Sequence, residues 1–541
     1  MLDRDTSWTR REFLTLLGGA SLISAVPSLA HAGRSESDIV TISILHTTDL
    51  HGHILPTIDY DGTRDLGGLA RCVTQIRRWR RKSPNTILID IGDVYQGTDI
   101  GLRTKGSLLI DLFNHLKFDA WVVGNHEFDW GVDPFVDAVR SSAMPVLAAN
   151  MSLAGRLAGQ WNDAGHPFYR VRPYLMKEIA GIRIAIIGIT TPGMRFWFRP
   201  EFIRDLDFLY PLEPVRQAMV QAKQEGANAI VLAGHMGLKN RGGGDDFANN
   251  VVSLTTELRD LAVFIAGHTH QLITTRVVND VLVTQADHFG IHVGRVDLHF
   301  DRNSKRLIGR EAICQRMDNR FRLDHTVLSR AKSQLDLSHA ALTEPIGELA
   351  EKFRVHGSAE QPSDVEMLIG AAIIESLREG GTEVDGVFHG AFEETGDVAA
   401  GPKSISDVWD ILPYENYVVS AQLSGDELKS VMEEVYANYD SRSLIGFNVR
   451  TTGTGRYRRV SSITPANGQL KLRGQKYSIA FNTFDSRSAG HRFMKLRSIL
   501  ETAEAQCVFH HVQTRDALVD YFRRHKVVRR SLFRPAIPVA A

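Results

Sequence analysis

Short apolar runs that stop at histidine, aspartate or asparagine recur through the first 300 residues of this chain. They have the length and β-branched composition of strands, and helical patterns such as GGLARCVTQIRRWRR (67–81) lie between several of them. The runs are IVTISIL (39–45), TILIDI (86–91), AWVVG (120–124), IRIAIIGIT (182–190), AIVLAG (229–234), VFIAG (263–267), VLVTQA (281–286) and VGRVDLHF (293–300). Strands that alternate with helices predict an α/β domain, here over residues 38–300, with strands covered on both faces.

Side chains of the types that bind metals follow several of these runs. They are Asp49 and His51 after ISILHTT, Asp93 in LIDIGD, Asn125 and His126 in VVGNHEFD, His235 in IVLAGH, and His268 and His270 in FIAGHTH. Ligands of open α/β sheets bind at the carboxyl ends of strands, so we expect these endings to meet at one site along a common sheet edge. A single ending of this kind arises readily by chance or in a capped turn, whereas the whole ordered set is improbable as a coincidence.

The chemistry of the set indicates which ligand it binds. Imidazole and carboxylate groups without thiolates suit zinc, manganese or iron, and seven candidate ligands are too many for one tetrahedral ion. Two ions about 3.5 to 4 Å apart can stabilise the attacking and leaving oxygens of a phosphoryl transfer. We therefore expect two divalent metal ions, Mn, Zn or Fe, as cofactors.

The order D-x-H, G-D, G-N-H-E, H, G-H-x-H resembles the calcineurin-like metallophosphoesterase superfamily. More narrowly, GDVYQGT (92–98), GNHEFDWG (124–131), GHMG (234–237) and GHTHQ (267–271) look like the 5′-nucleotidase family. The resemblance covers about residues 39 to 530 and is more specific in the first domain. It implies an α/β protein in which a layered α/β sandwich carries the catalysis, and a helix joins it to a C-terminal mixed α/β domain of the 5′-nucleotidase type.

The resemblance also implies a role for each residue. One metal would be held by Asp49, His51 and His270, the other by Asn125, His235 and His268, and Asp93 would bridge them. His126 and Asp129 match the family's catalytic dyad. The expected reaction is phosphoester hydrolysis, in which a metal-bridging hydroxide attacks phosphorus in line with the leaving oxygen, because two cations lower the pKa of the water between them. His126, oriented by Asp129, would stabilise charge or protonate the leaving group.

The second half of the chain predicts a connection and a second domain. Residues 301–345 differ in character, and HTVLSRAKSQLDLSHAAL (325–342) is polar with helical spacing, as a connecting helix would be. Helical and β-type segments resume afterwards, which predicts a mixed α/β domain over residues 346–530. In the family this domain supplies the nucleotide pocket.

The expected pocket departs from the family pattern. The family's N-x-G-G-I-R segment is replaced by FHGAFEETGDV (388–398), which contains no arginine, and its G-G-D-G-Y segment is altered in NTFDSRSAGHRF (482–493). Arg487 or Arg492 could replace the missing cation. Phe447 and Phe493 are candidates for stacking on a base, although a buried core phenylalanine is the more frequent case. A nucleotide is thus the expected substrate class, with its identity left open.

The first residues resemble an export signal. Paired Arg10 and Arg11 precede the apolar stretch LTLLGGASLISAVPSLA, and AHA (30–32) is an A-x-A cleavage site. We expect residues 1–32 to be a twin-arginine signal peptide, with the twin-arginine (Tat) export machinery as partner and the periplasm as destination. A plain secretory peptide is the alternative, and the apolar stretch is too short for a stable membrane anchor.

Composition narrows the classes of partner and of function. Lysine plus arginine number 63 and aspartate plus glutamate number 63, so net charge does not indicate a nucleic-acid duplex or a membrane surface. Three scattered cysteines predict neither a disulfide framework nor a thiolate metal site. The leading hypothesis is a secreted two-metal hydrolase of a small phosphate ester. The alternatives are a relative of the thiosulfohydrolase of sulfur oxidation and a binding protein that has lost catalysis.

Overall fold

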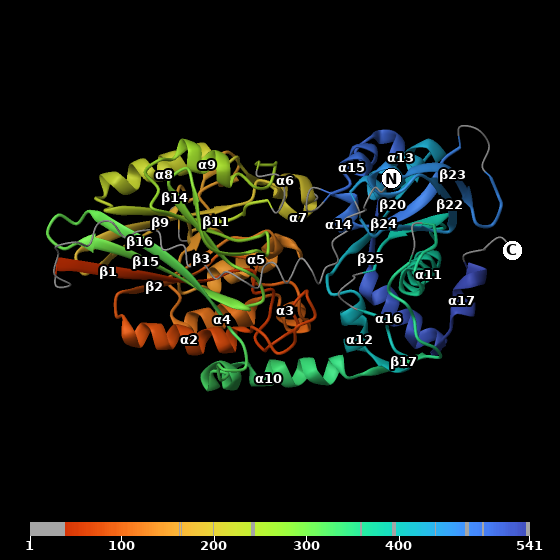
Figure 1. Ribbon diagram of the computed structural model, residues 1–541, viewed down its shortest axis with the longest axis horizontal. Helices are drawn as coiled ribbons and strands as arrows, with labels where there is room; N and C mark the ends of the chain where they lie inside the picture. The colour runs from red at the N-terminus through yellow and green to blue at the C-terminus, as the bar shows by residue number, and fades with distance from the viewer. Residues whose placement is uncertain are drawn as a thin grey trace, which may run out of the picture.

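The computed structural model describes residues 38–536 apart from positions 162, 164, 199, 240–243, 358–359, 392–395, 439, 471–474 and 489–491. The expected signal peptide lies outside the described residues. Figure 1 shows two bodies side by side, with one long helix running along the lower edge between them. Among the described helices, none is both long and apolar enough to cross a bilayer.

The first body is built on two large β-sheets. The seven-stranded sheet has the order β16-β15-β1-β2-β3-β4-β7, and the six-stranded sheet has the order β13-β14-β12-β11-β9-β8. The first comprises β1 (Ile39–Thr47), β2 (Thr86–Asp90), β3 (Ala120–Val122), β4 (Val146–Leu147), β7 (Val171–Arg172), β15 (His292–Asp301) and β16 (Leu307–Arg316). The second comprises β8 (Tyr174–Ile179), β9 (Ile182–Thr190), β11 (Ala229–His235), β12 (Val263–Ala266), β13 (Leu272–Val278) and β14 (Val281–Ala286). A small third sheet contains β5 (Met151–Leu153), β6 (Arg156–Leu157) and β10 (Leu206–Phe208).

Alternation along the strands places the two sheets face to face. Successive strand residues point to opposite faces, and in β1 Ile44 joins the core between the sheets while Leu45 joins the core beneath the helices of the first sheet. In β9, Ile186 lies in the same intersheet core and Ile187 lies on the other side. Both faces of the central strands are therefore buried, which explains the continuous apolar runs in the sequence.

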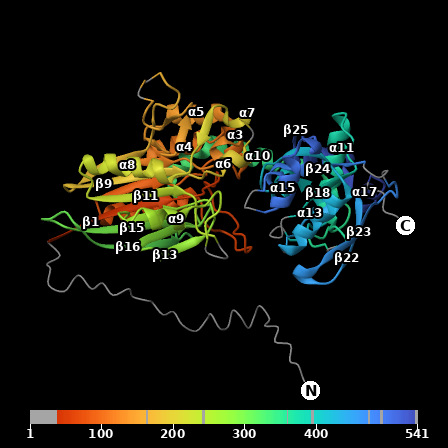
Figure 2. The ribbon, with the colours of Figure 1, turned by 90° about the horizontal axis from the view of Figure 1, so that it is seen from above.

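Helices cover the outer faces, so the body has four layers (Figures 1 and 2). On the first sheet lie α2 (Leu69–Lys82), α3 (Asp99–Thr104), α4 (Ser107–Leu116) and α5 (Val132–Ser141), and on the second lie α8 (Leu212–Gln224) and α9 (Val251–Glu257). Three short helices, η2 (His126–Phe128), α6 (Met194–Trp197) and α7 (Pro200–Ile203), occupy loops. The predicted layered α/β sandwich is confirmed.

The first domain extends past residue 300, where the sequence suggested that it ends. β16 pairs antiparallel with β15 along most of its length, from His292 opposite Arg316 to Phe300 opposite Leu307. Most of its residues are half-buried or exposed, because β16 lies at the sheet edge, and it therefore lacks the long apolar run of a central strand. The connection proper is helix α10 (His325–Leu342), which contacts α2, α3 and α4 of the first domain and α12 of the second.

The second body is a mixed α/β domain, as predicted. Its central sheet has the order β21-β18-β24-β20-β25, a second sheet has the order β19-β17-β26, and β22 pairs with β23. These strands are β17 (Pro345–Leu349), β18 (Gly386–His389), β19 (Gly401–Ser404), β20 (Tyr417–Leu423), β21 (Ser443–Ile445), β22 (Phe447–Thr452), β23 (Arg459–Pro465), β24 (Tyr477–Asn482), β25 (Val508–Gln513) and β26 (Val527–Val528). The helices are α11 (Asp364–Glu379), α12 (Ile405–Ile411), α13 (Gly425–Ala437), η4 (Gly455–Tyr457), α14 (Thr483–Ser486), α15 (Met494–Leu500), η6 (Ala503–Ala505), α16 (Thr514–His525) and α17 (Arg530–Ala536).

Candidate metal centre

The candidate ligands meet where strands of two different sheets end. β1, β2 and β3 are parallel neighbours in the seven-stranded sheet, and β11 and β12 are parallel neighbours in the six-stranded sheet. The expectation that all the endings share one sheet edge is therefore wrong. They still converge, because the two sheets face each other across the shared core and present their carboxyl ends on the same side.

Most of these residues have an unusual backbone conformation. Asp49, His51, Asp93, His268 and His270 have φ angles of 50°, 47°, 55°, 71° and 49°. Residues other than glycine rarely adopt this left-handed region, and such strain concentrates at functional sites. The loops that contain them support each other, since the Asp49 N–H donates to the Gly92 carbonyl (3.0 Å) and the His51 N–H donates to the Asp93 carbonyl (2.9 Å).

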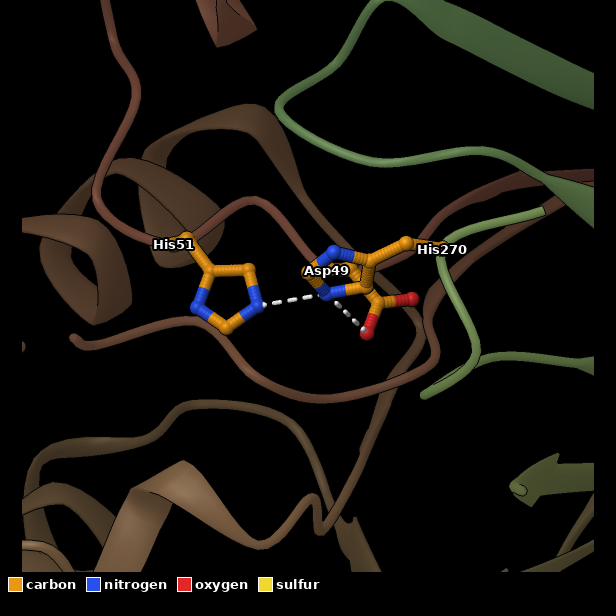
Figure 3. Close-up of side chains that lie close together, drawn as sticks. All are labelled: Asp49, His51 and His270. Atoms are coloured by element: carbon orange, nitrogen blue, oxygen red, sulfur yellow. Dashed lines mark hydrogen bonds and ion pairs between the residues drawn. The ribbon is translucent and has the colours of Figure 1, made fainter. Parts of the chain in front are cut away.

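One group of ligand atoms belongs to Asp49, His51 and His270 (Figure 3). The Nε2 atoms of His51 and His270 lie 3.0 Å apart, and His270 Nε2 lies 3.5 Å from Asp49 Oδ1. Asp49 also accepts hydrogen bonds from the His268 N–H at 3.0 and 3.1 Å. The structure thus brings together the trio that the resemblance assigns to one metal.

A second group contains Asp93, His235 and His268. His235 Nε2 lies 3.0 Å from Asp93 Oδ2, and the backbone N–H of His126 donates to Asp93 Oδ1 at 2.8 Å. Asp93 Oδ2 also lies 3.8 Å from His51 Nε2 in the first group. Asp93 thus lies between the two groups, where the resemblance implies a bridging ligand.

The hydrogen bonds of the histidines fit a role in metal binding. His51 Nδ1 lies 2.7 Å from the Gln96 carbonyl oxygen, and His235 Nδ1 lies 2.7 Å from the Ile91 carbonyl oxygen. A carbonyl can only accept, so Nδ1 carries a proton and Nε2 faces the site, which is the orientation in which Nε2 would present its lone pair to a bound metal. The amide oxygen of Asn125 is buried and accepts no hydrogen bond from any described residue, as expected of a further ligand atom.

Burial and neighbouring charges together set the pKa values of these side chains. It lowers the pKa of His51 and of His268 to about 3, which keeps both imidazoles neutral, the form that binds a metal. Burial and the nearby charge of Asp93 raise the pKa of Asp49 to about 7, although His235 opposes the shift. Several carboxylates gathered in one buried site favour a compensating cation.

His126 and Asp129 form a hydrogen-bonded pair at the edge of this site. His126 Nδ1 lies 2.6 Å from Asp129 Oδ2, and His126 Nε2 lies 4.0 Å from Asp93 Oδ2. Burial alone would lower the pKa of His126, but the carboxylates of Asp129 and Asp93 raise it to about 10. The side chain is 28% exposed, so a group bound beside Asp93 can reach it.

Glu127 is a supporting residue to which the sequence pattern assigned no role. Its fully buried carboxylate accepts hydrogen bonds from the backbone N–H groups of Val94 (2.7 Å), Gly124 (2.7 Å) and Asp93 (3.2 Å). It therefore joins the loop after β2 to the loop after β3. The sequence signal that could have identified Glu127 is its place in GNHEFDWG, beside Asn125 and His126.

The candidate substrate residues of the second domain do not form a comparable site. Phe447 and Phe493 are 5% and 1% exposed and belong to the hydrophobic core around α13, so the expectation that their faces stack on a base is not met. The guanidinium of Arg492 pairs with Asp440 and lies 5.7 Å from the ring centroid of Phe493. Arg487 lies close enough to Cys507 for its charge to oppose the burial that raises the pKa of that thiol.

Comparison with known proteins supports the division into two domains. Residues 42–272 match the calcineurin-like phosphoesterase family, and residues 345–497 match the 5′-nucleotidase C-terminal domain family. A trifunctional nucleotide phosphoesterase of Bacillus subtilis is 24% identical over 474 residues, which are 76% of this chain and 31% of that relative. A probable 5′-nucleotidase of Treponema pallidum is 24% identical over 468 residues, 73% of this chain and 75% of that relative. This chain thus corresponds to about a third of the length of the Bacillus relative.

Solved structures share the same fold. A putative 5′-nucleotidase from Staphylococcus aureus has a TM-score of 0.73 and 23% identity, covering 89% of this chain and 96% of that one. A sulfate thiohydrolase from Thermus thermophilus has a TM-score of 0.61 and 17% identity, covering 90% and 95%. The two matched families account for both bodies of the structure. The chain therefore consists of a calcineurin-like phosphoesterase domain followed by a 5′-nucleotidase C-terminal domain.

Proposed function

We propose that this protein is a two-metal phosphoester hydrolase that acts on small phosphate esters, with nucleotides as the substrate class. The observation that carries the proposal is the convergence of two ligand groups on Asp93, with the His126–Asp129 pair beside them. One ion would be held by Asp49, His51 and His270, the other by Asn125, His235 and His268, with Asp93 shared. Manganese, zinc and iron all suit these ligands.

The surrounding residues suit phosphoryl transfer. When bound, the ions would supply positive charge to the phosphoryl oxygens and a water of lowered pKa for attack on phosphorus. Asp129 holds the His126 ring through Nδ1, which leaves Nε2 on the side of Asp93. From there His126 can donate a hydrogen bond to a phosphoryl oxygen or a proton to the leaving oxygen.

The substrate class rests on the relatives, two of which are named for nucleotide or 5′-nucleotidase activity. The second domain is the part of the chain that would distinguish one nucleotide from another. Its core phenylalanines are covered, so recognition of the base would use other residues than Phe447 and Phe493.

The first test is an activity screen with paired variants. Purified protein supplied with manganese or zinc is assayed on p-nitrophenyl phosphate, nucleoside monophosphates, cyclic nucleotides and a nucleotide sugar. Asp93→Asn is expected to abolish activity because it removes the shared carboxylate, with fewer ions bound. His126→Ala is expected to lower kcat by about 10²-fold or more with both ions retained.

His115→Ala is the matched control, because His115 is an exposed histidine in α4. Its activity should equal that of the unmodified protein. Hydrolysis of none of the phosphate esters by metal-loaded protein would refute the proposal. Turnover of a thiosulfate-type substrate would then favour the thiohydrolase alternative, and inactivity toward both would favour a binding protein.

A further inference from the structure

A tyrosine pair links the second domain to a candidate metal ligand. The hydroxyl of Tyr60, in the loop between β1 and α2, lies 2.8 Å from His270 Nδ1 and 2.6 Å from the hydroxyl of Tyr414. Tyr414 follows α12 in the second domain. The Tyr60 ring also stacks on His288, with ring centroids 4.3 Å apart, which holds it beside His270.

The direction of these hydrogen bonds follows from metal binding. If His270 Nε2 is the ligand atom, its Nδ1 carries the proton and donates to the Tyr60 oxygen. The Tyr60 hydroxyl can then donate its own proton to the Tyr414 oxygen. Each tyrosine hydroxyl can serve as donor and acceptor, so the chain His270, Tyr60, Tyr414 is chemically consistent.

Glu415, the residue after Tyr414, contacts Gln96, which forms a hydrogen bond with His51, the second histidine of the group Asp49, His51 and His270. Its carbonyl oxygen accepts from the side-chain amide of Gln96 at 3.3 Å, and the Gln96 carbonyl in turn accepts from His51 Nδ1. The Glu415 carboxylate accepts a hydrogen bond at 2.8 Å from Nε1 of Trp130, the residue that follows Asp129 in the chain. Within the second domain this carboxylate lies 3.7 Å from Arg515 Nη1, an ion pair that favours its charged form.

The other ligand group has its supports in the first domain. His235 Nδ1 bonds the Ile91 carbonyl, and Asp93 accepts from the His126 N–H. Tyr414 and Glu415 therefore reach the supports of His51 and His270, whose Nε2 atoms lie 3.0 Å apart. Within the part of the chain that the structure describes, the hydrogen bonds of His235 and Asp93 stay in the first domain. Of the two expected ions, the one held by Asp49, His51 and His270 is therefore the one whose ligands the second domain supports.

We propose that Tyr414 and Glu415 form an interdomain clasp that positions His270 and His51, and so sets the affinity of the ion held by Asp49, His51 and His270. Tyr60 and Tyr414 are positioning residues in this arrangement. The inference rests on the proposed two-metal centre. It makes the docking of the second domain a determinant of metal binding at one of the two positions.

The test measures metal binding without substrate. The full chain is stripped with a chelator and titrated with manganese by calorimetry, for the unmodified protein and for Tyr60→Phe and Tyr414→Phe. Each variant removes one hydroxyl and keeps the ring. Loss of a hydrogen-bonding partner behind a metal ligand costs about 10- to 100-fold in affinity, so both variants should weaken one binding step by about tenfold or more and leave the other unchanged.

Tyr417→Phe is the matched control. Tyr417 is three residues from Tyr414, its ring contacts Phe202 of the first domain, and its hydroxyl accepts from Gln513; among the described residues it has no bond toward the metal ligands. It should bind both ions as the unmodified protein does. The clasp would be overturned if all the proteins bound manganese with equal affinity, or if the variants weakened both binding steps equally. It would also be overturned if Tyr60→Phe weakened binding and Tyr414→Phe did not. An unmodified protein that binds no manganese would instead refute the proposed function.

Discussion

Asp49, His51, Asp93, His268 and His270 share positive φ angles although each carries a Cβ atom that disfavours this region. Their loops are held by bonds to buried carboxylates and carbonyls rather than by helix or sheet ladders. Close backbone contact contributes as well, since a Cβ on Gly124 would lie 2.3 Å from the Asp93 nitrogen. Side chains that are held in this way need little reorganisation when an ion binds.

Glu127→Gln tests this support at the scale of one residue. Three backbone N–H groups donate to the two carboxylate oxygens, and an amide would turn an NH₂ group toward at least one of them. We expect the free energy of unfolding to fall by about 1 to 3 kcal/mol, the cost of unsatisfied buried donors. Denaturant unfolding of the metal-free protein measures it. Glu257→Gln, which alters an exposed carboxylate, is the control. An equally small change in the free energy of unfolding of both variants would contradict the supporting role of Glu127.

At the scale of elements, α10 connects the domains and is anchored at its first turn. Asp324 accepts from the N–H groups of Thr326 (3.0 Å) and Val327 (3.2 Å), and it pairs with Arg77 of α2 at 3.0 Å. Its own N–H donates to the Ala70 carbonyl at 2.9 Å. A single residue thus caps the connecting helix and ties it to the first domain.

Asp324→Ala should destabilise the protein by about 1 kcal/mol, because N-cap substitutions cost about that much. The melting temperature and denaturant midpoint measure the change. Asp336→Ala is the matched control in the same helix, since its exposed pair with Lys332 should contribute at most about 0.5 kcal/mol. A cap variant as stable as the control would show that α10 begins without help from Asp324.

At the scale of the whole molecule, the two domains touch close to the candidate site. Arg497 of α15 lies 4.7 Å from the ring centroid of Phe196 in the first domain, and Trp197 beside it packs against His268 with ring centroids 5.3 Å apart. Together with the clasp, these contacts place the second domain where it can influence both access to the metal centre and its geometry. Substrate selection and metal retention are therefore expected to depend on the same interface.

The export of the whole chain remains a prediction from its first residues. We expect the double variant Arg10→Lys, Arg11→Lys to accumulate in the cytoplasm of a bacterial host that has twin-arginine export, because lysine does not reproduce the planar guanidinium. Cell fractionation and the size of the product measure it. Arg4→Lys, outside the pair, should be exported normally. Unchanged export of the double variant would favour the plain secretory peptide.

The sequence alone was sufficient to predict the two α/β domains, the connecting helix and the set of ligand-type residues. These depend on local patterns: apolar runs mark the strands, and Asp49, Asp93 and His268 stand where such runs end. The structure confirms the fold and brings six of the seven side chains, all but Asn125, into neighbouring groups, while their roles in metal binding stay a prediction.

Only the tertiary structure decided how distant segments meet. In the structure, the strand ends that carry the ligands come from two sheets, and the first domain extends to Arg316. Phe447 and Phe493 are buried in the core, and Tyr414 contacts Tyr60. None of these follows from local periodicity, because each depends on which surfaces pack against one another across hundreds of residues. Residue type therefore determines what the site can bind, and packing between layers and domains determines how the binding groups are held.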